Sequence, residues 1–252
     1  MEAAEILASA IKLAAEGSAD SDEYWELVRT LHQTPEQHVF DLAAGCCNAA
    51  TPSERSVGAD VLSQLGHPSE WDKAGQRPFT NQSAPLLRGL LSNSDVDVLT
   101  SAIHALGHHH IASAADLAGL LHHPSAEVRH AIAFALDSDD PQARGLLFEL
   151  MRDADVDVRD WATFAIGSQS EDDTPEIRDA LVSRLTDADE GVRGEALVGL
   201  ARRGDSKVID MILAGLNPVA SYLWIDAAEL ILEHFPNETR ISDALVRCTP
   251  RN

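Results

Sequence analysis

A ten-residue pattern recurs along the sequence at nearly constant spacing. Four copies align without gaps: Val98–Gly107, Val128–Asp137, Val158–Gly167 and Val192–Ala201. Their first residues are 30, 30 and 34 positions apart, and weaker copies occur at Val57–Gly66 and Leu223–Leu232. Self-similarity at such a period is typical of a solenoid, in which each repeat buries its apolar face only against its neighbours.

Each copy has the spacing of one face of an α-helix, because apolar residues and alanines recur at offsets 0, 4, 7 and 8. A second apolar segment lies between successive copies. These segments are Pro85–Leu91, Ala114–Leu121, Pro141–Met151, Pro175–Leu185, Lys207–Leu216 and Thr239–Val246. Capping side chains precede a proline at Asp140-Pro141 and Thr174-Pro175, as at the start of a helix. The pattern therefore predicts an array of helical hairpins.

The hairpins predict a single solenoid over residues 1–252. Its expected parts are irregular helices and a degenerate repeat at 1–66, a long loop at 67–83, a regular array at 84–235 and a capping helix at 236–252. The irregular helices are expected near 2–15, 22–33, 36–48 and 53–65. In the loop, Trp71 and Phe79 either fold back onto the solenoid or form a binding element; we favour the first, because apolar residues in a long loop usually anchor it.

The array resembles the HEAT family, and in particular the bacterial HEAT-like repeats first named for phycobilisome lyases. The shared pattern is an Asp, then Val-Arg about six residues later, then Ala-x-x-Ala-Leu-Gly. Asp153 with Arg159 and Asp187 with Arg193 fit this pattern, whereas Arg129 follows a histidine. The resemblance implies an all-α, right-handed α-α superhelix of about five to six hairpins.

The resemblance also implies an inter-repeat ladder, meaning contacts between an acid of one repeat and an arginine of the next. Its expected members are Arg129, Asp153, Arg159, Asp187 and Arg193. The pair Asn93 and Leu99 departs from the pattern, since neither the acid nor the arginine is present there.

The formal net charge is −22. Such a charge disfavours nucleic acids and anionic membranes and favours a basic partner, although it also simply keeps a protein soluble. The three cysteines are odd in number and two are adjacent, so no disulfide framework follows. With no apparent signal peptide and no long apolar run, we expect a cytoplasmic monomer.

In the resembled family the second helix of each hairpin lines a concave face. Positions that the core leaves free on these helices carry the candidate partner-binding residues, which are His104, His108, Phe134, Asp160, Trp161, Phe164 and Glu195. Large aromatic residues with a polar rim are typical of protein-binding hot spots. Phe134 and Phe164 could instead pack between repeats as core, whereas the positions equivalent to Trp161 hold small or charged residues.

No motif indicates catalysis. His104 and His108 have a metal-binding i, i+4 spacing, but no third ligand is evident. Nucleophile and phosphate-loop motifs do not occur. We therefore expect neither an enzyme nor a metal or cofactor. The predicted function is a non-enzymatic protein-binding module: a scaffold, an assembly factor or a toxin-neutralising immunity protein that takes a basic partner. The alternative is an accessory subunit of a phycobilin-lyase-like chromophore attachment system.

The charge leads to a first prediction. The three lysines, Lys12, Lys73 and Lys207, all lie outside the repeat helices expected to form the concave face, and that face carries acids. We expect no binding of duplex DNA at physiological salt. A fluorescence titration with labelled duplex checks this, and sub-micromolar affinity that weakens with added salt would contradict it.

Overall fold

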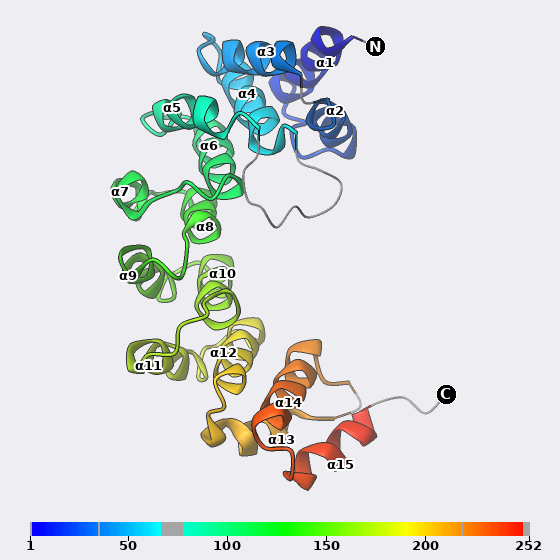
Figure 1. Ribbon diagram of the computed structural model, residues 1–252, viewed down its shortest axis with the longest axis vertical. Coiled ribbons are helices and arrows are strands. Elements are labelled where there is room, and N and C mark those ends of the chain that lie inside the picture. Colours follow the sequence, from blue (N-terminus) through cyan, green and yellow to red (C-terminus); the bar gives the residue numbers. More distant parts are fainter. Residues whose placement is uncertain (1, 35, 67–77, 218, 249–252) are drawn as a thin grey trace. The chain divides into compact units, whose positions relative to one another are not determined.

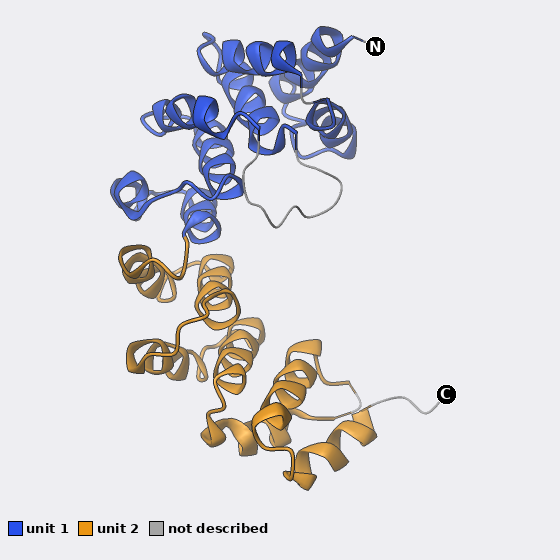
Figure 2. Ribbon diagram, viewed as in Figure 1, with its two compact units in different colours: residues 1–136 blue, residues 137–252 orange. Residues whose placement is uncertain are grey.

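The computed structural model describes residues 2–34, 36–66, 78–217 and 219–248. Within these residues the chain is helical throughout and contains no strand, which confirms the all-α prediction. It divides into two compact units, residues 1–136 and residues 137–252 (Figure 2). That the two units together form a single solenoid stays a prediction from the sequence.

Unit 1 contains helices α1 to α8. Their bounds are α1 Ala3–Ala15, α2 Asp22–His32, α3 Gln37–Cys47, α4 Pro52–Gln64, α5 Thr80–Leu90, α6 Val96–His108, α7 Ala114–Leu117 and α8 Ala126–Ala135, with a 3-10 turn at Ala118–Leu120 after α7. Helix α4 packs against α6, and α6 against α8. These three inner helices form one row, and α3, α5 and α7 accompany them as outer helices (Figure 1).

Unit 2 repeats this arrangement with helices α9 to α15. Their bounds are α9 Pro141–Leu150, α10 Val156–Phe164, α11 Pro175–Arg184, α12 Glu190–Arg202, α13 Ile209–Gly215, α14 Tyr222–His234 and α15 Thr239–Cys248. A π turn, Ala165–Gln169, extends α10, and a 3-10 turn, Ser206–Val208, precedes α13. The inner helices are α10, α12 and α14, and α12 packs against both of the others.

Side-chain caps determine where the inner helices begin. The cap residues are Thr51, Asp95, Ser125, Asp155 and Asp189, and each accepts a hydrogen bond from a backbone N–H in the first turn of its helix. Such a bond satisfies one of the amides that a helix start leaves without a partner. The predicted helices therefore begin within a few residues of their expected positions.

The repeating apolar positions form the core, as the periodicity predicts. Val98, Val128, Val158 and Val192 are all fully buried. Four residues further along each helix come Ala102, Ile132, Ala162 and Ala196, which are also fully buried. The small residues allow close helix contacts: a Cβ on Gly199 would lie 2.6 Å from the Cα of Gly167, so the backbones there touch directly.

An arginine in the first turn of four inner helices binds the preceding turn. Arg55, Arg129, Arg159 and Arg193 each direct Nη1 to the carbonyl oxygens five and six residues earlier in the chain. For Arg159 these acceptors are Asp153 and Ala154, at 2.9 and 3.1 Å. Charged hydrogen bonds of this kind fix the turn to the helix that follows it.

Arg159 also reaches the next hairpin. Its Nε and Nη2 donate to the two carboxylate oxygens of Asp187 at 3.0 and 3.1 Å, and the Asp187 side chain is 6% exposed. The hydrogen bond with Arg159 and the nearby guanidinium charges lower the pKa of Asp187, although burial opposes them. A bidentate, mostly buried pair of this kind holds two successive repeats in register.

Helix α5 differs from the prediction. It begins at Thr80, inside the segment expected to be loop, and Pro85 lies within it instead of at its start. Phe79 precedes it with a φ of 69°, and its ring stacks on Phe40 with centroids 4.9 Å apart. This stacking, together with the burial of Ser83 and Leu87, packs the first turn of α5, which was expected to be loop, against unit 1. Phe79 thus folds back as favoured, whereas Trp71 lies outside the described residues.

The Arg159–Asp187 pair leads to a stability prediction. Arg159→Ala removes charge-assisted bonds to Asp187 and to two carbonyl groups, so we expect the free energy of unfolding to fall by about 1.5–3 kcal/mol. The control is Arg152→Ala, because Arg152 is exposed in the turn after α9 and, among the described residues, its side chain bonds only to the Phe148 carbonyl group; we expect about 0.5 kcal/mol or less.

Chemical denaturation of the two variants provides the measurement. Equal losses would contradict the assignment of Arg159 to the register of the repeats. Arg178 is a poor control, since it bonds to Asp173 and to the Arg203 carbonyl oxygen.

Candidate protein-binding surface

In unit 1 the structure brings three candidate residues together. His104 and His108 lie one turn apart on α6, and the ring of Phe134 on α8 packs against both. Its centroid is 5.1 Å from that of His104 and 5.0 Å from that of His108, each in an edge-on arrangement. All three side chains are half-buried, so this ring cluster is neither core nor fully exposed surface.

The ring cluster carries no positive charge from His104 at neutral pH. Burial lowers the pKa of His104 to about 4, and the nearby His130 lowers it further in the same direction. The imidazole is therefore neutral at pH 7.

A hollow of about 400 Å³ adjoins this ring cluster. Its lining adds the half-buried or exposed residues Trp25, Asp20, Asp60 and Asp97 to the three rings. Asp60 accepts a hydrogen bond from the buried Tyr24 hydroxyl at 2.5 Å, but burial outweighs this bond and raises the pKa of Asp60 to about 6. Sequence reasoning missed Asp60 and Trp25, because they lie outside the regular repeats.

In unit 2 a second aromatic pair lies on α10. Trp161 and Phe164 are both half-buried, and their ring centroids are 5.5 Å apart at an angle of 58°. Three acids belong to the same inner helices: Asp160 on α10, Glu195 on α12 and Asp226 on α14. Here, too, residues that the sequence singled out lie on neighbouring inner helices, and Asp226 holds the position on α14 equivalent to Trp161 on α10 and Glu195 on α12.

Glu195 is the most unusual of these acids. It is only 7% exposed, and within the described part of the chain no ion pair or hydrogen bond of its carboxylate occurs. Burial raises the pKa of Glu195 to about 7, and the negative charges of Asp160 and Asp226 raise it further. A buried carboxylate with two like charges nearby and no cation is costly.

Other charged contacts in the units were not predicted from the sequence. Arg88 binds Asp116, and Arg144 binds Asp172, so these pairs have the same 28-residue separation as Arg159 and Asp187. That recurring spacing is a signal that could have identified them.

Arg203 was also missed. It donates to the carbonyl oxygens at the end of α10 and in the turn beyond it, namely Ile166, Gly167, Ser170 and Asp172. It thereby closes the π turn that no sequence pattern indicated.

Two searches address other kinds of site. Across the described ranges, no three His, Cys, Asp or Glu side chains are grouped so that they could hold a metal ion. No helix in those ranges is both long enough and apolar enough to cross a membrane.

Comparison with known proteins agrees with this architecture. Residues 143–231 match the family model for HEAT repeats. The fold resembles that of YibA from Escherichia coli, with a TM-score of 0.64 and 23% identity over 98% of this chain and 97% of that chain. An archaeal HEAT-like repeats protein from Thermococcus onnurineus NA1 is also similar, with a TM-score of 0.55 and 15% identity over 97% of this chain and 98% of that chain. No protein of curated function matches the chain.

A designed armadillo repeat protein solved in complex with the peptide (KR)4 is also similar, with a TM-score of 0.53 and 17% identity over 79% of this chain and 98% of that chain. Residues 143–231 thus match the HEAT-repeat model, and the chain has the fold of HEAT- and armadillo-like repeat proteins. The family resemblance seen in the sequence is confirmed.

Glu195 leads to a pH-dependent prediction. Because its folded pKa is near 7 and its ordinary value is 4.5, the folded chain binds this proton more tightly than the unfolded chain. The resulting penalty is absent below pH 4.5 and complete above about pH 7. We expect Glu195→Gln to raise the free energy of unfolding by roughly 1–3 kcal/mol at pH 8, with the difference shrinking towards pH 4.5.

Denaturation curves at several pH values measure this difference. Glu229→Gln, an exposed change on α14, is the matched control and should have little effect. A Glu195→Gln effect that does not vary with pH would contradict the buried-charge assignment.

Proposed function

We propose that this chain is a non-enzymatic binding protein whose inner helices engage a positively charged partner protein. The observation that carries the proposal is Glu195, a residue that is only 7% exposed and has no ion pair among the described residues. The charges of Asp160 and Asp226 act on it, and it lies on the same row of inner helices as Trp161 and Phe164. The face of unit 2 that carries these five residues is called the acidic face below.

A lysine or arginine of the partner would offset the cost of ionised Glu195. Opposite charge close to a buried carboxylate favours its ionised form, so the penalty that burial imposes in the free protein becomes binding energy in the complex. Trp161 and Phe164 would add apolar area, and their ring faces attract the same cations.

The overall charge supports the same partner. A net charge of −22 accelerates the approach of a basic protein and repels acidic ones. The fold is compatible with such a role, since the designed armadillo repeat protein that resembles this chain was solved with a basic peptide. That likeness is one of fold, so the residues of the acidic face carry the argument.

The biological setting stays a proposal. Scaffold, assembly factor and toxin-neutralising immunity protein are all roles that one basic partner on the acidic face would serve, in a cytoplasmic monomer. The ring cluster of His104, His108 and Phe134 would provide a further contact area on unit 1. Chromophore attachment stays the alternative prediction from the sequence.

Binding of the peptide (Lys-Arg)4 by variants of the acidic face tests the proposal. Truncating a central aromatic anchor costs about 2 kcal/mol, so Trp161→Ala should weaken binding about 30-fold at physiological salt. Glu195→Gln should weaken it as well, because the buried charge is lost. Glu176→Ala, on the outer helix α11, is exposed and should bind like the wild type. Isothermal titration calorimetry gives the affinities.

A peptide of equal length without net charge, (Lys-Glu)4, separates specific from general attraction. The wild type should bind it far more weakly than (Lys-Arg)4. If Trp161→Ala and Glu195→Gln both bind (Lys-Arg)4 like the wild type while remaining folded, the attraction is only the diffuse charge of the protein. The acidic face would then not be the binding surface.

A further inference from the structure

Arg55 on α4 occupies the same place in its hairpin as Arg159 on α10. Each lies four residues after its cap residue, Thr51 or Asp155. Each uses Nη1 to bind the two carbonyl groups of the preceding turn, which for Arg55 are those of Ala49 and Ala50, both at 2.9 Å. The two arginines therefore occupy equivalent positions in two repeats.

The two arginines differ in the side chain that the next hairpin places at the equivalent turn. Asp187, which binds Arg159 through both oxygens, also accepts the Asp189 N–H with Oδ1 at 3.1 Å. Asn93 occupies the equivalent turn, since its Oδ1 accepts the Asp95 N–H at 2.9 Å. Asn93 carries a neutral amide where Asp187 carries a carboxylate. Its Oδ1 accepts the Asp95 N–H, and the other branch of its side chain is Nδ2, a donor that cannot accept a bond from an arginine.

Arg55 Nε is consequently buried without a hydrogen-bond partner in the described part of the chain. In Arg159 the same atom donates to Asp187. A buried guanidinium N–H that makes no bond costs free energy comparable to a lost hydrogen bond, and often more because the group is charged.

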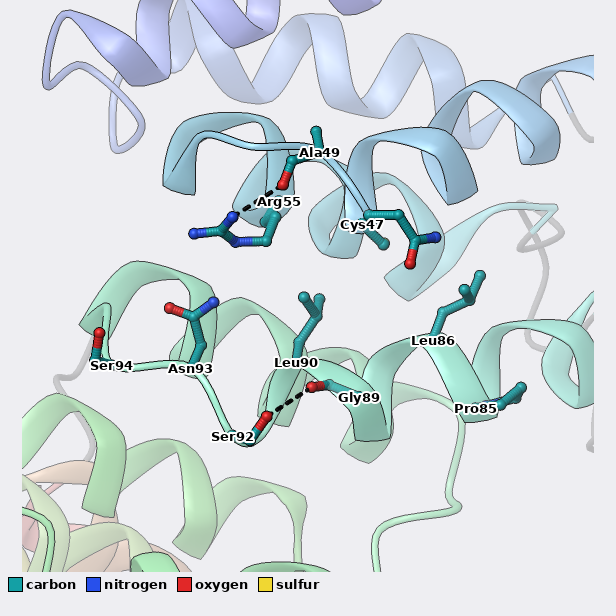
Figure 3. Close-up of a pocket in the computed structure, with 11 residues that line it drawn as sticks. Cys47, Ala49, Arg55, Pro85, Leu86, Gly89, Leu90, Ser92, Asn93 and Ser94 are labelled. Carbon is teal, nitrogen blue, oxygen red and sulfur yellow. Dashed lines mark hydrogen bonds between the residues drawn. The ribbon is translucent and has the colours of Figure 1, made fainter.

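A hollow of about 520 Å³ separates Arg55 from Asn93. Figure 3 shows Arg55 beside the turn that joins α3 to α4, and Asn93 directed towards it from the turn after α5. Leu86 and Leu90 point into the same space from α5 (Figure 3). Cys47 lines it as well, and burial raises the pKa of its thiol to about 12, so no thiolate opposes an anion there.

We infer that this hollow binds a carboxylate group carried on an apolar body. The Arg55 guanidinium group, through an N–H other than the buried Nε–H, and Asn93 Nδ2 supply donors for the two oxygens. Leu86, Leu90 and Pro85 contact the apolar part. The carboxylate is that of a free organic acid or of the C-terminus of a protein chain. This site lies in unit 1 and takes a negatively charged group, so it is separate from the acidic face.

Two-dimensional ¹⁵N NMR of the whole chain tests the site directly. The probes are octanoate and the peptide Ala-Ala-Leu with a free C-terminus, each paired with its amide, octanamide or amidated Ala-Ala-Leu. We expect saturable shifts of the Arg55 Nε–H and Asn93 Nδ2 signals with at least one carboxylate and not with its amide. Which carboxylate binds distinguishes the free acid from the chain terminus. Absence of saturable shifts with both carboxylates overturns the inference.

Asn93→Asp is the decisive variant, because it supplies the chain's own carboxylate to Arg55. We expect it to abolish the carboxylate-induced shifts and to raise the melting temperature. Asn81→Asp is the matched control: it adds the same charge on the exposed side of α5, outside the hollow, and should keep the shifts. Unchanged carboxylate binding by Asn93→Asp would overturn the assignment of Arg55 and Asn93, whatever its melting temperature.

Discussion

The arginine in the first turn of the inner helices is the contact on which the repeat geometry depends. A helical hairpin cannot bury its apolar face alone, so its fold requires a defined register with its neighbour. Arg159 provides this register because one guanidinium group binds the turn of its own hairpin and the Asp187 carboxylate of the next. In the hairpin of Arg55, the position equivalent to Asp187 is Asn93. Arg55 still binds the two carbonyl groups of its own turn, and a hollow lies beside it.

The same register produces the charges of the acidic face. Stacking equivalent helices places residues of one repeat beside those of the next, so acids that are distant in sequence become neighbours. Burial raises the pKa of Glu195, and the negative charges of Asp160 and Asp226 raise it further in this way. A solenoid tolerates the cost because its core of fully buried valines and alanines is independent of these acids. In the function we propose, a cation of the partner would offset this cost, and the difference would contribute to affinity.

Much of the fold could be predicted from local patterns. The period of 3.6 residues identified the buried face of α6, α8, α10 and α12, and the capping residues Asp140 and Thr174 located the starts of α9 and α11. The earliest repeat was harder to align from the sequence. Its apolar pattern starts at Val57, whereas the cap residue Thr51 aligns Arg55 with Arg159. The start of α5 depends on a tertiary contact between Phe79 and Phe40, which no local signal reports.

The residues of the candidate site could be predicted only in part, for a related reason. Offsets within a helix separate core from surface, but Phe134, Trp161 and Phe164 are half-buried, a state that depends on neighbouring side chains. The burial of Glu195 likewise follows from packing across repeats, and its neighbour Asp226 lies 31 positions further along the chain. Composition revealed the acidity, and the structure revealed that Glu195 is the buried acid without an ion pair among the described residues.

The central claim is that ionised Glu195 binds a cation of the partner protein. The most direct measurement is the pKa of the Glu195 side chain itself, followed by ¹³C NMR of the carboxyl group in the free protein and with saturating (Lys-Arg)4. The account predicts a pKa near 7 in the free protein, falling towards the ordinary glutamate value of 4.5 when the peptide is bound. A pKa near 4.5 in the free protein, or one near 7 that the peptide leaves unchanged, would contradict it.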